Sequence, residues 1–186
     1  MTYNPDIHHR KSIRLKGFGY SNEGMYFITI CTYNKEFIFY DLVGAGFPRP
    51  LPCLNKYGEV VQEYWDNISN HFKGVEIDEF VIMPNHIHGI IKINPYTNQG
   101  GETPPLQGKT PTLGQIVGYF KYQTTKTINQ IDTTPGRRVW QRNYYEQIIR
   151  TELDYFKITQ YIKDNPGNWY SDTENPCRSG VSPPCK

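Results

Sequence analysis

Two histidines one residue apart, His86 and His88, stand at the start of an apolar run in the stretch MPNHIHGIIKI. Side chains alternate between the two faces of a β-strand, so the two imidazoles are expected side by side on one face. Ile87, Gly89 and Ile91 then occupy the other face. Paired imidazoles are also common as ordinary surface or core residues of a strand, so a metal site needs further ligands.

A second set of polar side chains falls on one face of the last expected helix, at 152–165. Lys157, Tyr161 and Asn165 are four residues apart, and such residues are neighbours on a helix surface. Two imidazoles and the Asn165 amide oxygen would give a divalent cation three ligands and leave positions open for substrate oxygens. A tyrosine beside such an ion can attack a phosphodiester and form a phosphotyrosine. Because the chain has 15 tyrosines, this spacing also arises easily by chance.

The elements that must position these side chains are predicted from residue periodicity and turn residues. Strands are rich in β-branched and aromatic residues, and helices show apolar residues at helical spacing. In chain order we expect a strand at 25–33, a helix at 56–72, strands at 75–84 and 86–94, a helix at 113–128, a strand at the end of RRVWQRNYYEQIIR, and a helix at 152–165. This order predicts an α+β fold, a ferredoxin-like split β-α-β unit with an antiparallel sheet and an added C-terminal helix that carries the candidate nucleophile.

Length and composition indicate one globular domain with flanking segments. We assign 1–24 to a basic N-terminal arm, 25–169 to the domain and 170–186 to a polar tail, and expect a long flexible loop at 94–112. The four cysteines form no C-x-x-C pair and the chain starts without a signal-peptide pattern, which favours a reduced, cytoplasmic protein. No apolar run approaches the roughly 18 residues that span a bilayer, so a membrane is not an expected partner.

The formal net charge of +2 is too small to indicate nucleic-acid binding by itself, but the basic residues are clustered. The N-terminal arm either lies on phosphates or is a solvated tail. The stretch RRVWQRNYY interleaves arginines with aromatic rings, as single-strand binding surfaces do, although an ordinary edge strand can show the same pattern. The candidate DNA-binding residues are Arg10, Arg14, Lys16, Lys121, Arg137, Arg138, Arg142, Tyr144 and Lys157.

Five stretches in this order resemble a known family. They are RKSIRLKGFGYSNEGMYFITICT, FVIMPNHIHGII, LGQIVGYFKYQTTKTIN, VWQRNYYEQIIR and YIKDNP, and they cover most of 10–169. Together they resemble the HUH (His-hydrophobic-His) single-strand nucleases, more narrowly the IS200-like one-tyrosine transposases, and most closely the REP-associated tyrosine transposases. The loop at 94–112 and the segment after Trp169 have no counterpart in this resemblance.

The resemblance implies that His86 and His88 bind Mg²⁺ or Mn²⁺ and that Tyr161 is the nucleophile. Asn165 stands where insertion-sequence members carry a metal-facing glutamine. The implied reaction is cleavage and rejoining of single-stranded DNA near a REP-like hairpin, through a 5′-phosphotyrosine and a free 3′-hydroxyl. Tyr144 and Tyr145 are rival nucleophiles whose strand-like setting favours stacking or packing.

Two other functions stay open at this point. One is a hairpin-binding protein that has kept the fold without the chemistry. The other is an RNA-binding module, against which the chain shows no aromatic-rich RGFGF-like strand. A monomer and a homodimer are both compatible with the sequence.

Overall fold

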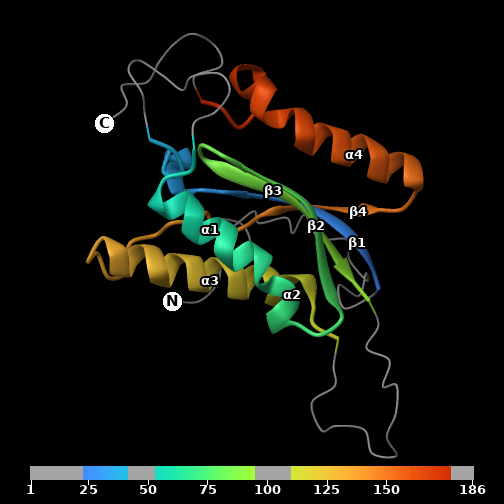
Figure 1. Ribbon diagram of the computed structural model, residues 1–186, viewed down its shortest axis with the longest axis horizontal. Coiled ribbons are helices and arrows are strands. Elements are labelled where there is room, and N and C mark those ends of the chain that lie inside the picture. The colour runs from blue at the N-terminus through green and yellow to red at the C-terminus, as the bar shows by residue number, and fades with distance from the viewer. Residues whose placement is uncertain (1–22, 42–52, 95–109, 177–186) are drawn as a thin grey trace, which may run out of the picture.

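Four strands form one antiparallel sheet in the order β2-β3-β1-β4 (Figure 1). The computed structural model describes residues 23–41, 53–94 and 110–176. Arg10, Arg14 and Lys16 of the expected basic arm, most of the 94–112 loop and the end of the tail lie outside the described residues. The strands are β1 (Gly24–Cys31), β2 (Val75–Met83), β3 (His86–Ile93) and β4 (Tyr145–Ile149).

Strands and helices follow one another along the chain in the order that the sequence predicts. This confirms the α+β, ferredoxin-like architecture with an added C-terminal helix. Asn55 caps the first helix, Thr112 forms a capping box with Gln115 on the third, and Thr151 caps the last, as these residue types do at helix N-termini. The helices are α1 (Lys56–Asp66), α2 (Ile68–His71), α3 (Leu113–Ile131) and α4 (Glu152–Asp164), with short 3-10 helices η1 (Tyr33–Lys35) and η2 (Asn165–Ser171).

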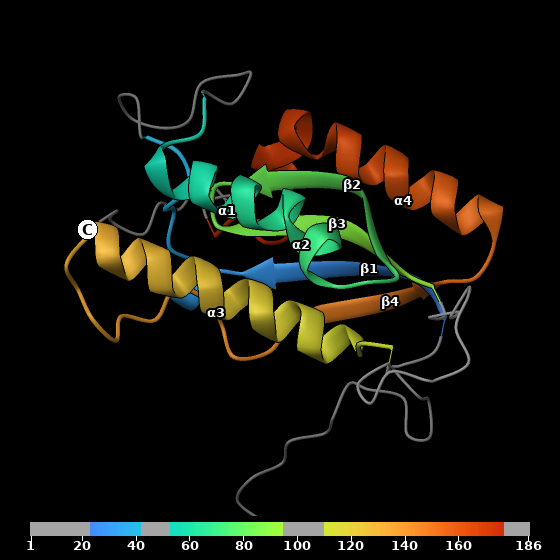
Figure 2. The same ribbon diagram turned by 60° about the horizontal axis from the view of Figure 1, so that its bottom comes forward.

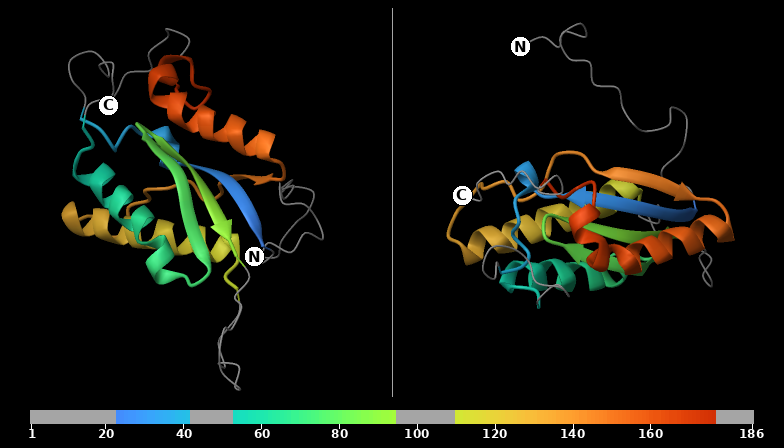
Figure 3. Two further views of the ribbon diagram at one scale, coloured as in Figure 1. Left: turned by 45° about the vertical axis from the view of Figure 1, so that its right-hand side comes forward. Right: turned by 90° about the horizontal axis from the view of Figure 1, so that it is seen from above.

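The helices cover the two faces of the sheet unequally. Helices α1 and α3 lie side by side on one face (Figure 2), and the main core fills the space between them and the sheet. Helix α4 crosses the opposite face (Figure 3), where Ile158 and Ile162 pack with Phe27 and Ile90. The histidine face of β3 is therefore the α4 face.

Gly89 shows why the apolar strand that carries the histidines needs a glycine. A Cβ built at Gly89 would lie 2.4 Å from ring atoms of Trp65. The Trp65 ring stacks on Phe80 at a centroid distance of 4.2 Å and is almost fully buried. A glycine here lets α1 approach the sheet closely enough to seat this large ring.

Several expected boundaries differ from the structure by one to a few residues, and two of the differences have a clear local cause. The helix expected at 56–72 is divided at Asn67, whose side-chain amide and backbone N–H both donate to the Glu63 carbonyl. An asparagine side chain that competes in this way favours helix ends. The first strand ends at Cys31 rather than at residue 33, because residues 33–35 form η1, in which Asn34 and Lys35 have positive φ values.

Helix α4, which carries the candidate nucleophile Tyr161, buries one apolar face against the sheet and ends three residues after Tyr161. Ile162 is buried against the sheet, whereas Lys157 is exposed. Pro166 lies in the first turn of η2, and the chain here returns to the start of β3, where Trp169 lies beside His86. Within the described residues, no helix is both long enough and apolar enough to cross a membrane.

Candidate metal centre and basic groove

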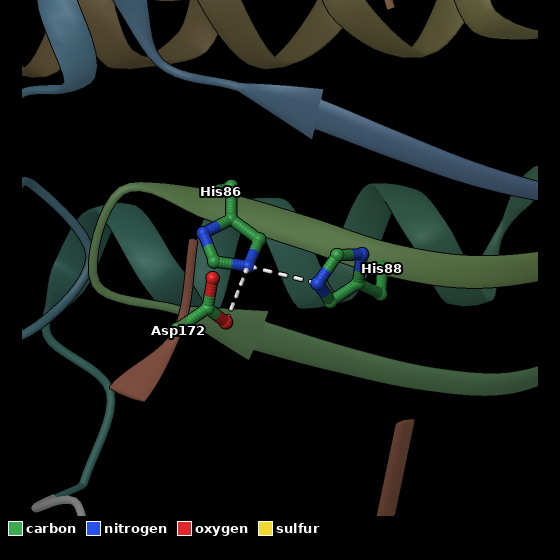
Figure 4. A group of neighbouring side chains, drawn as sticks. All are labelled: His86, His88 and Asp172. Carbon is green, nitrogen blue, oxygen red and sulfur yellow. Dashed lines mark hydrogen bonds and ion pairs between the residues drawn. The ribbon is translucent and has the colours of Figure 1, made fainter. Parts of the chain in front are cut away.

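The two strand histidines lie side by side in a buried site next to Asp172 (Figure 4). The Nε2 atoms of His86 and His88 lie 2.9 Å apart, and both rings are almost completely buried. Their other ring nitrogens are engaged, His86 Nδ1 with Asn85 Oδ1 and His88 Nδ1 with Thr29 Oγ1, both at 2.8 Å. Such outer partners orient histidine rings in metal sites.

A carboxylate that the sequence analysis did not single out completes the cluster. Asp172 lies just after η2, is 8 % exposed, and has its Oδ2 3.7 Å from His86 Nε2. His86, His88 and Asp172 each offer a ligand atom, and these atoms all lie within 4.8 Å of one another. Asp172 falls in the segment 170–186 that is expected to be a polar tail, and no local pattern distinguishes it from an exposed acidic residue there.

The donor set fits a divalent cation. Asp172 Oδ2 and Asn165 Oδ1 are buried side-chain oxygens without a hydrogen-bond partner among the described residues. Buried polar atoms left unpaired are costly and rare, and two imidazole nitrogens with the Asp172 oxygen suit a Mg²⁺-, Mn²⁺- or Zn²⁺-sized ion. The cluster could therefore bind a metal ion.

Burial keeps both imidazoles neutral, which is the form that binds a metal. Burial lowers the pKa of His88 to about 4 and, with the neighbouring His88 ring, lowers the pKa of His86 well below its usual value. Burial also raises the pKa of Asp172. Taking charged groups out of water without a counter-charge disfavours their charged forms, so a bound cation would reverse the effect on the carboxyl group.

Lowering the pH should therefore begin to destabilise the metal-free protein near pH 6.5, which is above the pH range in which most carboxylates titrate. The unfolded chain has a His88 pKa near 6.5 and binds a proton that the folded protein, with a pKa of about 4, rejects. Stability is complete above about pH 6.5 and falls as the pH drops towards 4. We expect urea unfolding to show a loss of roughly 2 kcal/mol between pH 7.5 and 5 from His88 alone.

His88→Gln serves as the test variant for this pH dependence and His71→Gln, an exposed histidine of α2, as its control. The loss between pH 7.5 and 5 should shrink in His88→Gln and persist in His71→Gln. Equal losses in the two variants would contradict the neutral burial of His88.

Tyr161 lies beside this cluster on α4. Its hydroxyl is 3.2 Å from His88 Nε2, and its ring meets Phe27 edge to face at a centroid distance of 6.1 Å. The side chain is 45 % exposed, so a substrate can reach the hydroxyl group. Burial raises the pKa of Tyr161, and the Asn165 side chain opposes this rise by hydrogen bonding.

The rival tyrosines lie on or next to β4. Tyr145 is 52 % exposed, its hydroxyl donates to Gln147, and its ring also meets Phe27 edge to face. It thus shares the α4 face with the histidines, from which it is separated by β1. Tyr144 packs partly buried against the main core.

Four of the candidate DNA-binding residues line one open groove of about 1230 Å³ between η1, α3 and the chain before β4. The Arg138 guanidinium lies over the Tyr33 ring at 5.7 Å, and the exposed ring of Tyr122 stands on the α3 side. Tyr144 and Lys157 do not line it. The four are Lys121, Arg137, Arg138 and Arg142.

These four cations differ in how far they are neutralised. Arg137 forms ion pairs with Asp132 and Glu36, and Lys121 donates to the backbone carbonyls of residues 141 and 142 while burial lowers its pKa to about 8. Across the described segments, Arg138 and Arg142 form no ion pair. Their charges are therefore not neutralised by another side chain of the described segments.

An ion pair connects a residue that lines the groove with the segment that carries Asp172. Lys35, which lines the groove, binds the Glu174 carboxylate at 3.1 Å. Glu174 also accepts from the Cys31 thiol at 3.3 Å, and its backbone N–H donates to Asp172. The groove and the buried cluster therefore lie at the same end of the sheet.

Comparisons with known proteins identify a sequence relative and a structural neighbour that can be compared over most of the chain. The chain is 44 % identical over 178 residues to a Haemophilus influenzae protein described as uncharacterized, a match that covers 91 % of this chain and 95 % of that protein. The structural neighbour is a REP-associated tyrosine transposase bound to a REP hairpin, with a TM-score of 0.53, 14 % identity, and coverage of 94 % of this chain and 89 % of that one. At that identity the likeness shows a shared fold. No protein-family profile matches the chain.

Proposed function

We propose that this chain, which belongs to one family with the Haemophilus influenzae protein and has the fold of a REP-associated tyrosine transposase, is a metal-dependent, single-strand DNA endonuclease and transposase. It cleaves and rejoins DNA near hairpins through a 5′-phosphotyrosine. The observation that carries this proposal is the 3.2 Å contact between the Tyr161 hydroxyl and His88 Nε2, at the rim of a buried cluster that fits a divalent cation.

The reaction that this geometry supports is a transesterification. Attack by Tyr161 Oη on a backbone phosphorus forms the Oη–P bond and breaks the P–O3′ bond. The phenolic proton goes to solvent, which reaches the half-exposed side chain, and the released 3′ oxygen takes up a proton to become a free hydroxyl. Because the phosphoester is kept on the protein, the reverse attack by a 3′-hydroxyl rejoins DNA without ATP.

The residues of the site have two proposed roles, which are to bind the metal ion and to orient Tyr161. His86, His88 and Asp172, with Asn165 as a further oxygen donor, would hold Mg²⁺ or Mn²⁺, which supplies Lewis-acid stabilisation of the phosphate charge. Phe27 holds the Tyr161 ring by edge contact, and the Asn165 side chain hydrogen bonds to Tyr161. These contacts favour one orientation of the nucleophile before substrate arrives.

The proposal is tested by incubating the purified chain with a labelled library of single-stranded hairpin DNAs and Mg²⁺ or Mn²⁺. We expect label that stays with the protein after denaturation, together with a free 3′-hydroxyl fragment. DNA that is bound but never cleaved would instead identify a hairpin-binding protein without the chemistry.

The basic groove is proposed to hold the DNA backbone. Replacing Arg138 and Arg142 together by alanine should weaken hairpin binding and lower the slope of log affinity against log salt by roughly 1.4 to 1.8, since each phosphate contact contributes about 0.7 to 0.9. Fluorescence anisotropy over a salt series measures both quantities. Arg137→Ala should have a smaller effect because its charge is already paired.

A charge-matched control separates the groove from net charge. Lys73 and Arg150 are exposed and do not line the groove, so Lys73→Ala with Arg150→Ala removes the same charge elsewhere. If this pair lowers affinity and salt slope as much as the Arg138 and Arg142 pair, the groove is not the binding surface.

A further inference from the structure

Asn85, in the tight turn between β2 and β3, makes directional contacts with two distant parts of the chain. It is completely buried. Its Oδ1 lies 2.8 Å from His86 Nδ1, and its Nδ2 lies 2.9 Å from the Glu174 carbonyl and 3.4 Å from the Lys35 carbonyl. Carbonyl oxygens only accept hydrogen bonds, so the amide nitrogen must face them and the amide oxygen must face His86.

This orientation determines the tautomer of His86. An amide oxygen cannot donate, so His86 Nδ1 carries the ring proton in the 2.8 Å contact. A neutral imidazole has only one N–H, and the Nε2 atom is therefore left with its lone pair. The His86 Nε2 atom lies 2.9 Å from His88 Nε2 and 3.7 Å from the Asp172 carboxylate, so its lone pair would be available to a metal ion held by these three side chains.

His88 is held differently. Its Nδ1 contacts the Thr29 hydroxyl, which can either donate or accept. His88 can thus direct an Nε2–H at His86 in the metal-free protein and carry the proton on Nδ1 when Nε2 binds a cation. Only His86 has its metal-binding tautomer imposed by a partner that cannot reverse its role.

The second set of Asn85 contacts reaches the acidic ligand. The Glu174 carbonyl accepts from Asn85, and the Glu174 backbone N–H donates to Asp172 Oδ1 at 2.6 Å. One carboxylate oxygen is thereby engaged, and the other, Oδ2, stays unpaired towards His86. Asn85 is connected in this way to ligands on two elements that are more than 80 residues apart in the sequence.

We infer that Asn85 is a positioning residue of the metal centre, which holds His86 as the Nδ1–H tautomer and keeps the Asp172 segment over it. This inference rests on the metal centre of the proposed function. Loss of such outer partners typically weakens metal binding about 10- to 100-fold.

Three variants separate the two contacts from a general loss of stability. Asn85→Ala removes both contacts. Asn85→Asp keeps an acceptor facing His86 but sets a carboxylate oxygen against the Glu174 and Lys35 carbonyls. Asn55→Ala is the matched control, because Asn55 also uses Oδ1 to accept from backbone N–H groups and Nδ2 to donate to a carbonyl, at the start of α1.

The experiment reads the histidine tautomers by ¹⁵N NMR in the metal-free full-length protein at pH 7.5, and then measures Mn²⁺ affinity by calorimetry. We expect a pure Nδ1–H tautomer for His86 in the wild type, Asn85→Asp and Asn55→Ala, and a mixture in Asn85→Ala. Mn²⁺ affinity should fall about 10- to 100-fold in both Asn85 variants and stay unchanged in Asn55→Ala.

Faster amide exchange at 172–175 in Asn85→Asp would support the tie to the Asp172 segment. An Nδ1–H tautomer that persists in Asn85→Ala, with wild-type Mn²⁺ affinity, overturns the inference. A wild type that binds no Mn²⁺ contradicts the metal centre itself, whereas the tautomers are read without metal and still decide whether Asn85 controls His86.

Discussion

Tyr161→Phe should abolish the covalent protein–DNA adduct and lower cleavage by a factor on the order of 10³ or more, as loss of a nucleophile does. The variant keeps the ring that packs edge to face on Phe27 and His88. It removes only the hydroxyl group that lies 3.2 Å from His88 Nε2. Folding and hairpin binding should therefore survive, which circular dichroism and anisotropy can confirm.

Two further tyrosines make the necessary controls. Tyr145→Phe is the stricter one, because Tyr145 is exposed, lies on the same face of the sheet and also contacts Phe27. Tyr144→Phe tests a ring that packs on the main core. Both variants should form the adduct, and peptide mapping of the trapped complex should find DNA on Tyr161. DNA mapped to Tyr145 would refute the assignment, and cleavage without any adduct would indicate attack by water.

The sheet and its histidine face could be predicted because they depend on local patterns. Alternation along β3 places His86 and His88 on one face whatever lies above them, and spacing along α4 places Tyr161 one turn before Asn165. Such periodicities survive without knowledge of tertiary contacts. The order of elements then left few topologies for the chain to adopt.

Asp172 could not be predicted in the same way. Its burial depends on Glu174, which is tied to Asn85 across 89 residues and to Cys31 across 143 residues. A polar segment after a helix reads as a solvated tail unless these pairings are known. The groove shows the same limit, since Arg137 and Arg138 are adjacent and equally basic, and only the fold brings Asp132 and Glu36 to Arg137.

The metal centre gives the second large effect. His86→Ala and His88→Ala should each remove detectable cleavage and weaken Mn²⁺ binding by well over the roughly 10- to 100-fold typical of an outer partner, because each removes an atom that binds the ion directly. Hairpin binding in the absence of metal should remain close to that of the wild type, since the groove lies outside the cluster. His71→Ala, a surface histidine stacked on Tyr119, should change neither property.

Comparing Asp172→Ala with Asn165→Ala then ranks the two candidate oxygen ligands, whose Oδ2 and Oδ1 atoms are both buried and without a hydrogen-bond partner among the described residues. A charged carboxylate contributes more to a hard cation than a neutral amide does, so Asp172→Ala should lose more Mn²⁺ affinity, and Asp172→Asn should recover only part of it. Asn165→Ala should chiefly lower cleavage, because its side chain also hydrogen bonds to Tyr161. Wild-type cleavage and Mn²⁺ affinity in His86→Ala and His88→Ala would exclude these histidines as ligands. An Asn165→Ala variant that loses more Mn²⁺ affinity than Asp172→Ala would make the helix amide, rather than the carboxylate after η2, the principal third ligand.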